Sequence, residues 1–262
     1  VDRCSECGGL MKRVGSGTQK VEQELFDLFP KAKVLRMDAD TAGASRGHEA
    51  LLREFEEKKI PILLGTQMVA KGLDFENVTL VGVLDADLSL YAQNYHAAER
   101  TYSLLAQVVG RAGRGERPGR AVIQTYHPEN EVIQAAAKQD YETFYQNELR
   151  MRSLRRYPPF ADLFTLTVSG LDELRVIAAA RALCDALRYA CSQPPLKDLE
   201  VEVLGPAGAP VVKVNNRYRY CVYLCGKGGS VLRRTVSEYL LAFYARKENR
   251  GLDIFADCNA LQ

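Results

Sequence analysis

The first half of the chain alternates short apolar runs with amphipathic stretches, and this alternation is typical of a parallel sheet with helical crossovers. The helical spacing of apolar residues after Thr18, an expected N-cap, predicts a helix that ends before Pro30. Further helices are expected near 46–58 and 95–109, and strands at 33–37, 61–65, 79–84 and 120–125. The predicted fold class of this half is α/β with a parallel sheet.

The second half follows a different order of elements. Residues 128–156 read as one long helix, which Tyr157-Pro158-Pro159 ends because proline cannot continue the hydrogen-bond ladder. Beyond it we expect strand, helix, strand, strand, helix and strand, at 163–169, 172–190, 200–204, 218–224, 229–246 and 252–257. This order predicts a smaller α+β domain of ferredoxin-like, βαββαβ topology. The sequence therefore divides into one domain over 16–157 and another over 158–262.

The segment Gln107–Arg114 carries the clearest chemical signal. It sets Arg111 and Arg114 three residues apart behind a glutamine, with Gly110 and Gly113 beside them. A guanidinium group matches phosphate oxygens bidentately, and glycines permit a close approach of the backbone. This pattern favours contact with a nucleotide triphosphate. A solvated basic loop is the alternative, because further arginines continue the run.

A second segment with a phosphate-binding pattern lies upstream, at residues 62–75. It begins as a buried strand and breaks at Gly65-Thr66. Ligands of open α/β sheets bind at the carboxyl ends of strands, where a hydroxyl and free N–H groups can hold a phosphate. Thr66 is therefore a further candidate for phosphate binding.

Together these two segments resemble motifs V and VI of superfamily 2 helicases, which belong to the second of two RecA-like lobes. The chain is also similar to the PriA family of bacterial primosomal replication-restart helicases in four further stretches, at 34–41, 84–87, 96–100 and 105–107. The similarity extends from Cys4 to the last strand and is strongest between Gly65 and Tyr126. Residues 93–96 read Gln-Asn-Tyr-His, where that family usually has Pro-Asp-Phe-Arg.

The resemblance implies a RecA-like helicase lobe 2 in which three side chains act on ATP. Arg114 is expected to stabilise charge on the transferring phosphoryl group and Arg111 to help bind it. Gln107 is expected to link the nucleotide to the other lobe.

The resemblance also implies contacts with nucleic acid and with other proteins. Lys71, Gly72 and Asp74 are expected to contact the nucleotide sugar or the DNA backbone. The implied partners are forked and single-stranded DNA, single-strand binding protein, and primosome or helicase-loading proteins. The implied activity is 3′ to 5′ movement on forked DNA, in the cytoplasm of a bacterium and associated with the nucleoid.

Two motifs that a helicase needs to bind and hydrolyse ATP do not occur between Val1 and Gln262. The sequence contains neither GxxxxGK[ST] nor DExH. Those motifs hold the phosphates, Mg²⁺ and water in such enzymes. We therefore expect ATP and Mg²⁺ to be bound mainly by a missing N-terminal lobe of the same protein, and this chain alone not to hydrolyse ATP.

The cysteines suggest a zinc site that is only partly present. Cys4 and Cys7 form a CxxC pair, whereas structural zinc takes four ligands. The resemblance implies Zn²⁺ with partner cysteines upstream, so that residues 1–15 are the remnant of a zinc-binding insertion; a thioredoxin-like redox pair is the alternative. The other five cysteines lie in apolar patterns and are expected in the core. The odd total of seven fits a reducing cytoplasm.

The formal net charge is only +2, so no overall attraction to DNA is expected. Positive charge is instead concentrated in local clusters. The cluster at Arg150–Arg156 is expected either to bind DNA or to form a solvated helix end. Arg217 and Arg219 share one face of an expected strand, which makes them candidates for DNA binding. Tyr218 and Tyr220 point to the other face and are expected in the core rather than as base-stacking platforms. No run reaches the ~20 apolar residues that a membrane-spanning helix needs, so no membrane contact is expected.

Three functions are compatible with the sequence. The chain is part of a PriA-type helicase, part of another superfamily 2 translocase, or a non-enzymatic DNA or partner-binding module that retains a RecA-like lobe. Upstream sequence separates them, since a P-loop with further zinc-spaced cysteines favours the first and a P-loop without them favours the second. The absence of both upstream favours the third.

Overall fold

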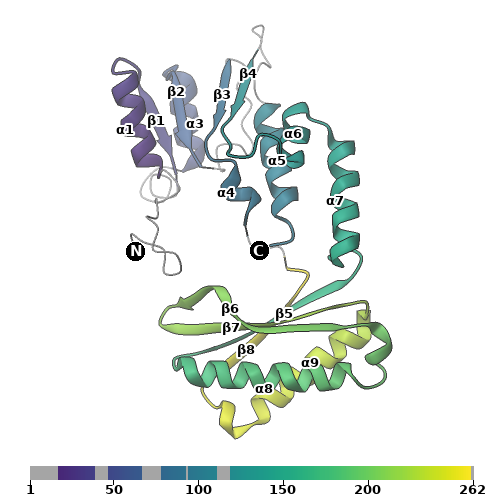
Figure 1. Cartoon of the computed structure of the whole chain (residues 1–262). Helices are drawn as coiled ribbons and strands as arrows, with labels where there is room; N and C mark the ends of the chain where they lie inside the picture. Colours follow the sequence, from purple (N-terminus) through teal and green to yellow (C-terminus); the bar gives the residue numbers. More distant parts are fainter. Residues whose placement is uncertain (1–16, 39–46, 67–77, 93, 111–118, 261–262) are drawn as a thin grey trace, which may run out of the picture. The chain divides into compact units, whose positions relative to one another are not determined.

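The computed structural model describes residues 17–38, 47–66, 78–92, 94–110 and 119–260 (Figure 1). These residues divide into two compact units. One holds the described residues up to Ala92 together with Ala97–Phe144, and the other holds those of Gln93–His96 together with Tyr145–Gln262. This division falls inside the helix Tyr141–Arg155. The boundary expected from the sequence, at residue 157, lies just after that helix and stays a prediction.

The first unit is built on parallel strand pairs. β1 (Val34–Met37) pairs with β2 (Ile62–Gly65), and β3 (Leu80–Val83) pairs with β4 (Arg120–Ile123). In sequence, α3 His48–Glu57 lies between β1 and β2, α4 Asp87–Leu90 and α5 Ala97–Val109 lie between β3 and β4, α1 Thr18–Leu28 precedes β1, and α6 Glu131–Lys138 follows β4. α7 Tyr141–Arg155 begins in this unit and continues into the second. The parallel α/β fold class predicted for this half is confirmed.

The core of the first unit forms around α5. Leu105 is fully buried, and Tyr102 stacks on Phe144 with ring centroids 4.1 Å apart and an interplanar angle of 10°. Ile133 and Ala136 of α6 complete this cluster. The aromatic stacking orients α5 relative to the start of α7, and the aliphatic burial orients α5 relative to α6.

The structure corrects the expected cap of α1. Gly17 is the N-cap and Thr18 is the first helical residue. The hydroxyl of Thr18 instead donates to the Asp38 carboxylate, 2.6 Å away, at the end of β1. Asp38 is buried, so it needs such donors more than the solvated helix end does.

The structure also corrects the expected single helix over 128–156. α6 and α7 are separate because Gln139 adopts a left-handed conformation, with φ 55° and ψ 31°. Asp140 then begins α7: its carboxylate accepts the Thr143 N–H at 3.0 Å and the Thr143 hydroxyl at 2.7 Å. These hydrogen bonds lower the pKa of Asp140, because they favour the ionised carboxylate.

The second unit is an antiparallel four-stranded sheet with two long helices on one face (Figure 1). Its elements are β5 Asp162–Gly170, α8 Glu173–Cys191, β6 Glu202–Val214, β7 Arg217–Gly226, α9 Gly229–Ala245 and β8 Asp253–Cys258, with short 3-10 helices at Lys197–Leu199 and Lys247–Asn249. The strand order β6-β7-β5-β8 and the βαββαβ sequence confirm the ferredoxin-like topology. Leu166, Val222 and Leu232 are fully buried between the sheet and the helices.

The strand expected at 200–204 is longer than predicted, because β6 continues to Val214. Register shifts after Leu204 and Gly208 mark irregularities in its pairing with β7. The chain reverses only at Asn215 and Asn216, which have φ 49° and 62°. Asparagine tolerates this left-handed region, which tight hairpin turns require.

No helix within the described ranges is long and apolar enough to cross a membrane.

Candidate functional site

The C-terminal end of α5 carries the predicted nucleotide-contacting glutamine. The inward stripe of this helix is buried, as at Tyr102, Leu105 and Val108. Gln107 lies off that stripe and is exposed. A helix fixed by its core therefore holds a polar side chain toward solvent, immediately before the arginine segment.

Gly110 ends this helix at a point of close approach. Its N–H donates to the Ala106 carbonyl at 2.9 Å, and a Cβ at this position would lie 2.9 Å from the Gln139 side-chain nitrogen. A larger residue would therefore displace Gln139. Arg111, Gly113 and Arg114, which follow, lie outside the described residues.

Thr66 lies at the carboxyl end of β2, directly after Gly65, and is exposed. Gly65 pairs with Met37, the last residue of the parallel strand β1, so the two strands end at the same edge. This is the position predicted for Thr66. Lys71, Gly72 and Asp74 lie outside the described residues.

The carboxyl ends of β3 and β4 are tied together by Asp87, a residue that sequence reasoning quoted only as part of a motif. Asp87 is buried, and its carboxylate accepts the Tyr126 N–H at 2.9 Å and the Thr125 hydroxyl at 3.0 Å. The Ala86 N–H donates to the Gln124 carbonyl at 3.1 Å. The signal that could have found Asp87 is an acidic residue shortly after an apolar strand.

Arg217 and Arg219 lie in the second unit, on the sheet face opposite the helices. Arg217 is already paired, because its Nε and Nη2 donate to the Ser169 hydroxyl and carbonyl, both at 3.2 Å, and Nη2 forms an ion pair with Asp253. The Nε of Arg219 is buried and has no hydrogen-bond partner among the described residues. Among the described residues, the Nε of Arg219 thus lacks the hydrogen bond that the Nε of Arg217 makes.

The tyrosines between these arginines face the helices, as predicted. Tyr218 and Tyr220 both pack against the core of the second unit. The hydroxyl of Tyr220 donates to the Glu173 carboxylate at 2.9 Å, and this hydrogen bond raises the pKa of Tyr220 because it favours the protonated phenol. Both rings therefore lie on the helix-covered face of the sheet and not on the face of Arg219.

The arginine face carries other aromatic side chains that the sequence reasoning did not select. Tyr223 lies on the same face of β7 as Arg219. Phe255 of β8 lies opposite Thr167 of β5 on that same face of the sheet. Phe255 is 42% exposed and Tyr223 is half-buried. Their register could have been found only from the strand order, which brings β8 beside β5.

The basic cluster at the end of α7 is partly neutralised. Arg152 pairs with Glu148 at 2.7 Å, and Arg156 pairs with Glu200 at 2.8 Å. Two of the arginines proposed for DNA contact therefore have carboxylate partners.

The cysteines divide between the core and the surface. Cys184 and Cys221 are buried as predicted, and burial raises the pKa of the Cys184 thiol. Cys191 and Cys225 are only partly buried and Cys258 is exposed, so core packing was wrong for Cys258. Within the part of the chain that the structure describes, no group of three or more His, Cys, Asp or Glu side chains could hold a metal ion. Cys4 and Cys7 lie outside that part, and their zinc site stays a prediction.

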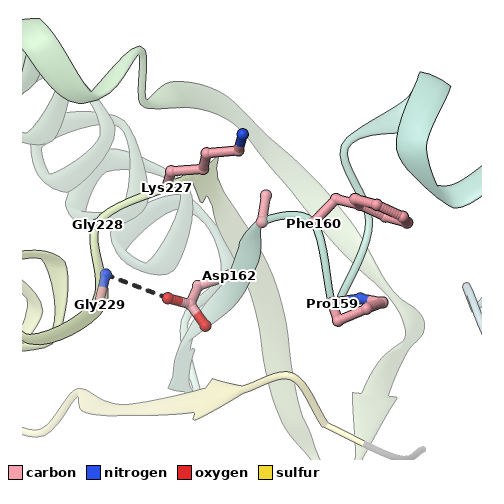
Figure 2. Close-up of a pocket in the computed structure, with 7 residues that line it drawn as sticks. Pro159, Phe160, Asp162, Lys227, Gly228 and Gly229 are labelled. Carbon is pink, nitrogen blue, oxygen red and sulfur yellow. Dashed lines mark hydrogen bonds between the residues drawn. The ribbon is translucent and has the colours of Figure 1, made fainter.

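One pocket of the second unit lies where β5 and α9 begin, with a volume of about 470 Å³ (Figure 2). Lys227 borders it, and the Asp162 carboxylate accepts the Gly229 N–H at 3.2 Å inside it. A carboxylate thus already occupies the N-terminal end of α9, which argues against an anion site there. Its lining residues are Pro159, Phe160, Ala161, Asp162, Lys227, Gly228 and Gly229.

Comparison with protein families divides the chain as the fold does. Residues 13–116 match the helicase conserved C-terminal domain, and residues 153–259 match the primosomal protein N C-terminal domain. The chain is 42% identical over 257 residues to the replication restart protein PriA of Bacillus subtilis (strain 168), covering 98% of this chain and 31% of that protein. It is 42% identical over 218 residues to the PriA of Synechocystis, covering 83% and 26%, and 36% identical over 223 residues to that of Rickettsia typhi, covering 84% and 33%.

A helicase-type α/β lobe followed by a primosomal C-terminal domain is the class that the fold and these matches define. The chain spans about a third or less of the length of these curated relatives. It belongs to the PriA family and corresponds to the C-terminal portion of its members.

Proposed function

We propose that this chain forms the nucleotide-contacting and DNA-contacting C-terminal part of an ATP-dependent replication-restart helicase. The observation that carries the proposal is the exposed end of α5, where Gln107 and Gly110 lead directly into the arginine segment. The family membership supports it. Arg114 and Arg111 then act on the ATP phosphates, and Thr66 lies at a strand end suited to the same ligand.

The remaining parts of this proposal follow from the family resemblance. A first lobe supplies most of the contacts to ATP and Mg²⁺, so that this chain alone does not hydrolyse ATP. The complete protein moves 3′ to 5′ on forked DNA, meets single-strand binding protein and helicase-loading proteins in the bacterial cytoplasm at the nucleoid, and holds Zn²⁺ through Cys4, Cys7 and further cysteines.

Reconstitution tests the nucleotide role. ATP hydrolysis on forked DNA is measured for this chain, and again after addition of the separately prepared N-terminal portion of a PriA-family protein. We expect turnover only in the mixture. Arg114→Ala in the mixture should lower turnover by roughly 10³ to 10⁵-fold, the scale of an arginine finger. The matched control is Arg234→Ala, an exposed arginine of α9 that pairs with Glu238.

Each alternative gives a different result. Turnover by this chain alone would contradict the missing-lobe proposal. Retention of more than about a tenth of the turnover by Arg114→Ala would contradict the role of that residue. Silence in a mixture whose two portions demonstrably associate would favour a non-enzymatic binding module.

A second proposed role is single-stranded DNA contact by the helix-free face of the C-terminal sheet. The strand register places Arg219, Tyr223 and Phe255 on this one face. A cation beside partly exposed rings is the combination that holds a phosphate backbone while bases stack. The free energy of each stacking contact is on the order of 1–3 kcal/mol by alanine substitution.

Fluorescence anisotropy with a labelled oligothymidylate tests this second role across a salt series. Arg219→Ala should weaken binding and reduce the slope of log K against log salt by about 1. Phe255→Ala should weaken binding while leaving the slope unchanged, because it removes no charge. Equal affinity of the chain with and without these substitutions would place DNA contact elsewhere.

A further inference from the structure

β8 presents a phenylalanine between two acidic residues on the helix-free face of the C-terminal sheet. Ile254 and Ala256 of this strand pack against the core between the sheet and the helices. Because side chains alternate along a strand, Asp253, Phe255 and Asp257 point to the opposite face. The partly exposed ring of Phe255 therefore has a carboxylate on either side, each two residues or about 7 Å along the strand.

The two carboxylates differ in their partners. Asp253 forms an ion pair with Arg217, which offsets its charge. Asp257 is half-buried, and within the described part of the chain its carboxylate makes no hydrogen bond or ion pair. A carboxylate that is partly removed from water gains most from a hydrogen-bond donor. Asp257 is therefore suited to accept a hydrogen bond from a bound molecule.

The positive charge of this face lies away from Asp257. Arg219 lies in the same row across the sheet as Asp253, and Asp257 is four residues or about 13 Å further along β8. The Nε of Arg219 is buried and has no hydrogen-bond partner among the described residues. A phosphate of a bound strand is attracted by Arg219 and repelled by Asp257. The end of the face at Asp257 therefore suits a base rather than the backbone.

A carboxylate beside a stacked base distinguishes bases by their amino groups. A carboxylate only accepts hydrogen bonds. Cytosine presents an amino group where thymine and uracil present a carbonyl oxygen, and adenine also presents an amino group. A base stacked on Phe255 can donate from such an amino group to Asp257. A carbonyl oxygen at that position instead sets one acceptor against another, which leaves both without a donor.

We propose that Asp257 is a specificity-determining residue of this face, which favours single-stranded DNA whose bases carry an amino group over DNA of thymine or uracil. The inference rests on the DNA contact proposed above for the same face. Phe255 supplies the stacking surface, Arg219 holds the backbone, and Asp257 selects the base.

Fluorescence anisotropy of the 262-residue chain with labelled oligodeoxycytidylate and oligodeoxyuridylate of equal length tests the selection. The two probes share one backbone, and cytosine has an amino group where uracil has a carbonyl. We expect oligodeoxycytidylate to bind about five- to tenfold more tightly, the scale of one hydrogen bond to a base edge. In Asp257→Asn this ratio should fall to about one, because an amide both donates and accepts.

The matched control is Glu202→Gln. Glu202 is exposed on the same face, opposite Cys225, but it belongs to β6, three strands away from β8. Its replacement removes the same charge, so both probes should bind more tightly to a similar extent and the ratio should not change. Thermal unfolding followed by circular dichroism checks that both variants are folded.

The outcomes separate the base preference from the DNA contact itself. A ratio of about one in the wild type, a ratio that survives in Asp257→Asn, or an equal loss of the ratio in Glu202→Gln would each overturn the role of Asp257. If both probes bind and Arg219→Ala weakens both, the proposed DNA contact stands whatever the ratio is. Failure of both probes to bind would contradict the DNA contact and the base preference together.

Discussion

Replacement of Asp87 by alanine should destabilise the first unit by about 3 kcal/mol. The carboxylate is 7% exposed and accepts hydrogen bonds from the Tyr126 N–H at 2.9 Å and the Thr125 hydroxyl at 3.0 Å. Hydrogen bonds to a charged group contribute ~1.5–3 kcal/mol each, and the two lost donors can partly rebond to water. The sum of the two, reduced for that rebonding, gives the expected value.

Urea unfolding followed by circular dichroism measures this free energy, with the two units fitted as separate transitions because two-state behaviour cannot be assumed for both together. Asp87→Asn keeps an acceptor and should lose about half as much. The control is Glu129→Ala, whose carboxylate is 75% exposed and lies 3.4 Å from the His127 ring nitrogen; it should change stability by less than about 0.5 kcal/mol. A loss under about 1 kcal/mol for Asp87→Ala would show that water replaces the carboxylate and would refute the reasoning.

Two further predictions concern the α6–α7 junction and the C-terminal sheet. Because the pKa of Asp140 is lowered in the folded protein, its contribution is present above the unfolded pKa and is lost as pH falls through the folded one. The stability difference between the wild type and Asp140→Ala should therefore narrow below about pH 4 in acid titration, and a difference independent of pH would contradict the capping role. Arg217→Ala and Asp253→Ala should be non-additive by about 0.5–1 kcal/mol in a double-mutant cycle read by thermal unfolding, since the ion pair is partly solvent-exposed. Additivity would mean that the Ser169 hydrogen bonds, rather than the ion pair, hold Arg217.

The order of elements could be predicted from the sequence because hydrophobic periodicity encodes it locally. The break between α6 and α7 was missed because apolar residues continue at helical spacing across it, from Ile133 to Phe144. The available signal was Asp140 followed three residues later by Thr143, a pattern that starts a helix. An analysis of hydrophobic periodicity alone therefore overlooks a helix cap that decides where α7 begins.

The extent of β6 was missed for another reason. The strand was expected to end at residue 204, before Gly205-Pro206, but proline is compatible with the edge of a sheet, where its missing N–H leaves no ladder bond unmade. The hydrogen bond from the Tyr95 hydroxyl to the Asn259 carbonyl could not be predicted locally, since the two residues are 164 positions apart. Of the predicted nucleotide contacts, the sequence placed Thr66 and Gln107 at a strand end and a helix end, and the structure has both exposed there.

The irregular course of β6 also bears on association between copies of the chain. β6 is thirteen residues long and forms an outer edge of the four-stranded sheet, so a regular strand here would offer a continuous row of free peptide groups to another molecule. Pro206 and Pro210 each remove a donor from that row, and the register shifts twist it out of line. The same prolines and register shifts that make β6 irregular therefore protect the sheet against edge-to-edge aggregation.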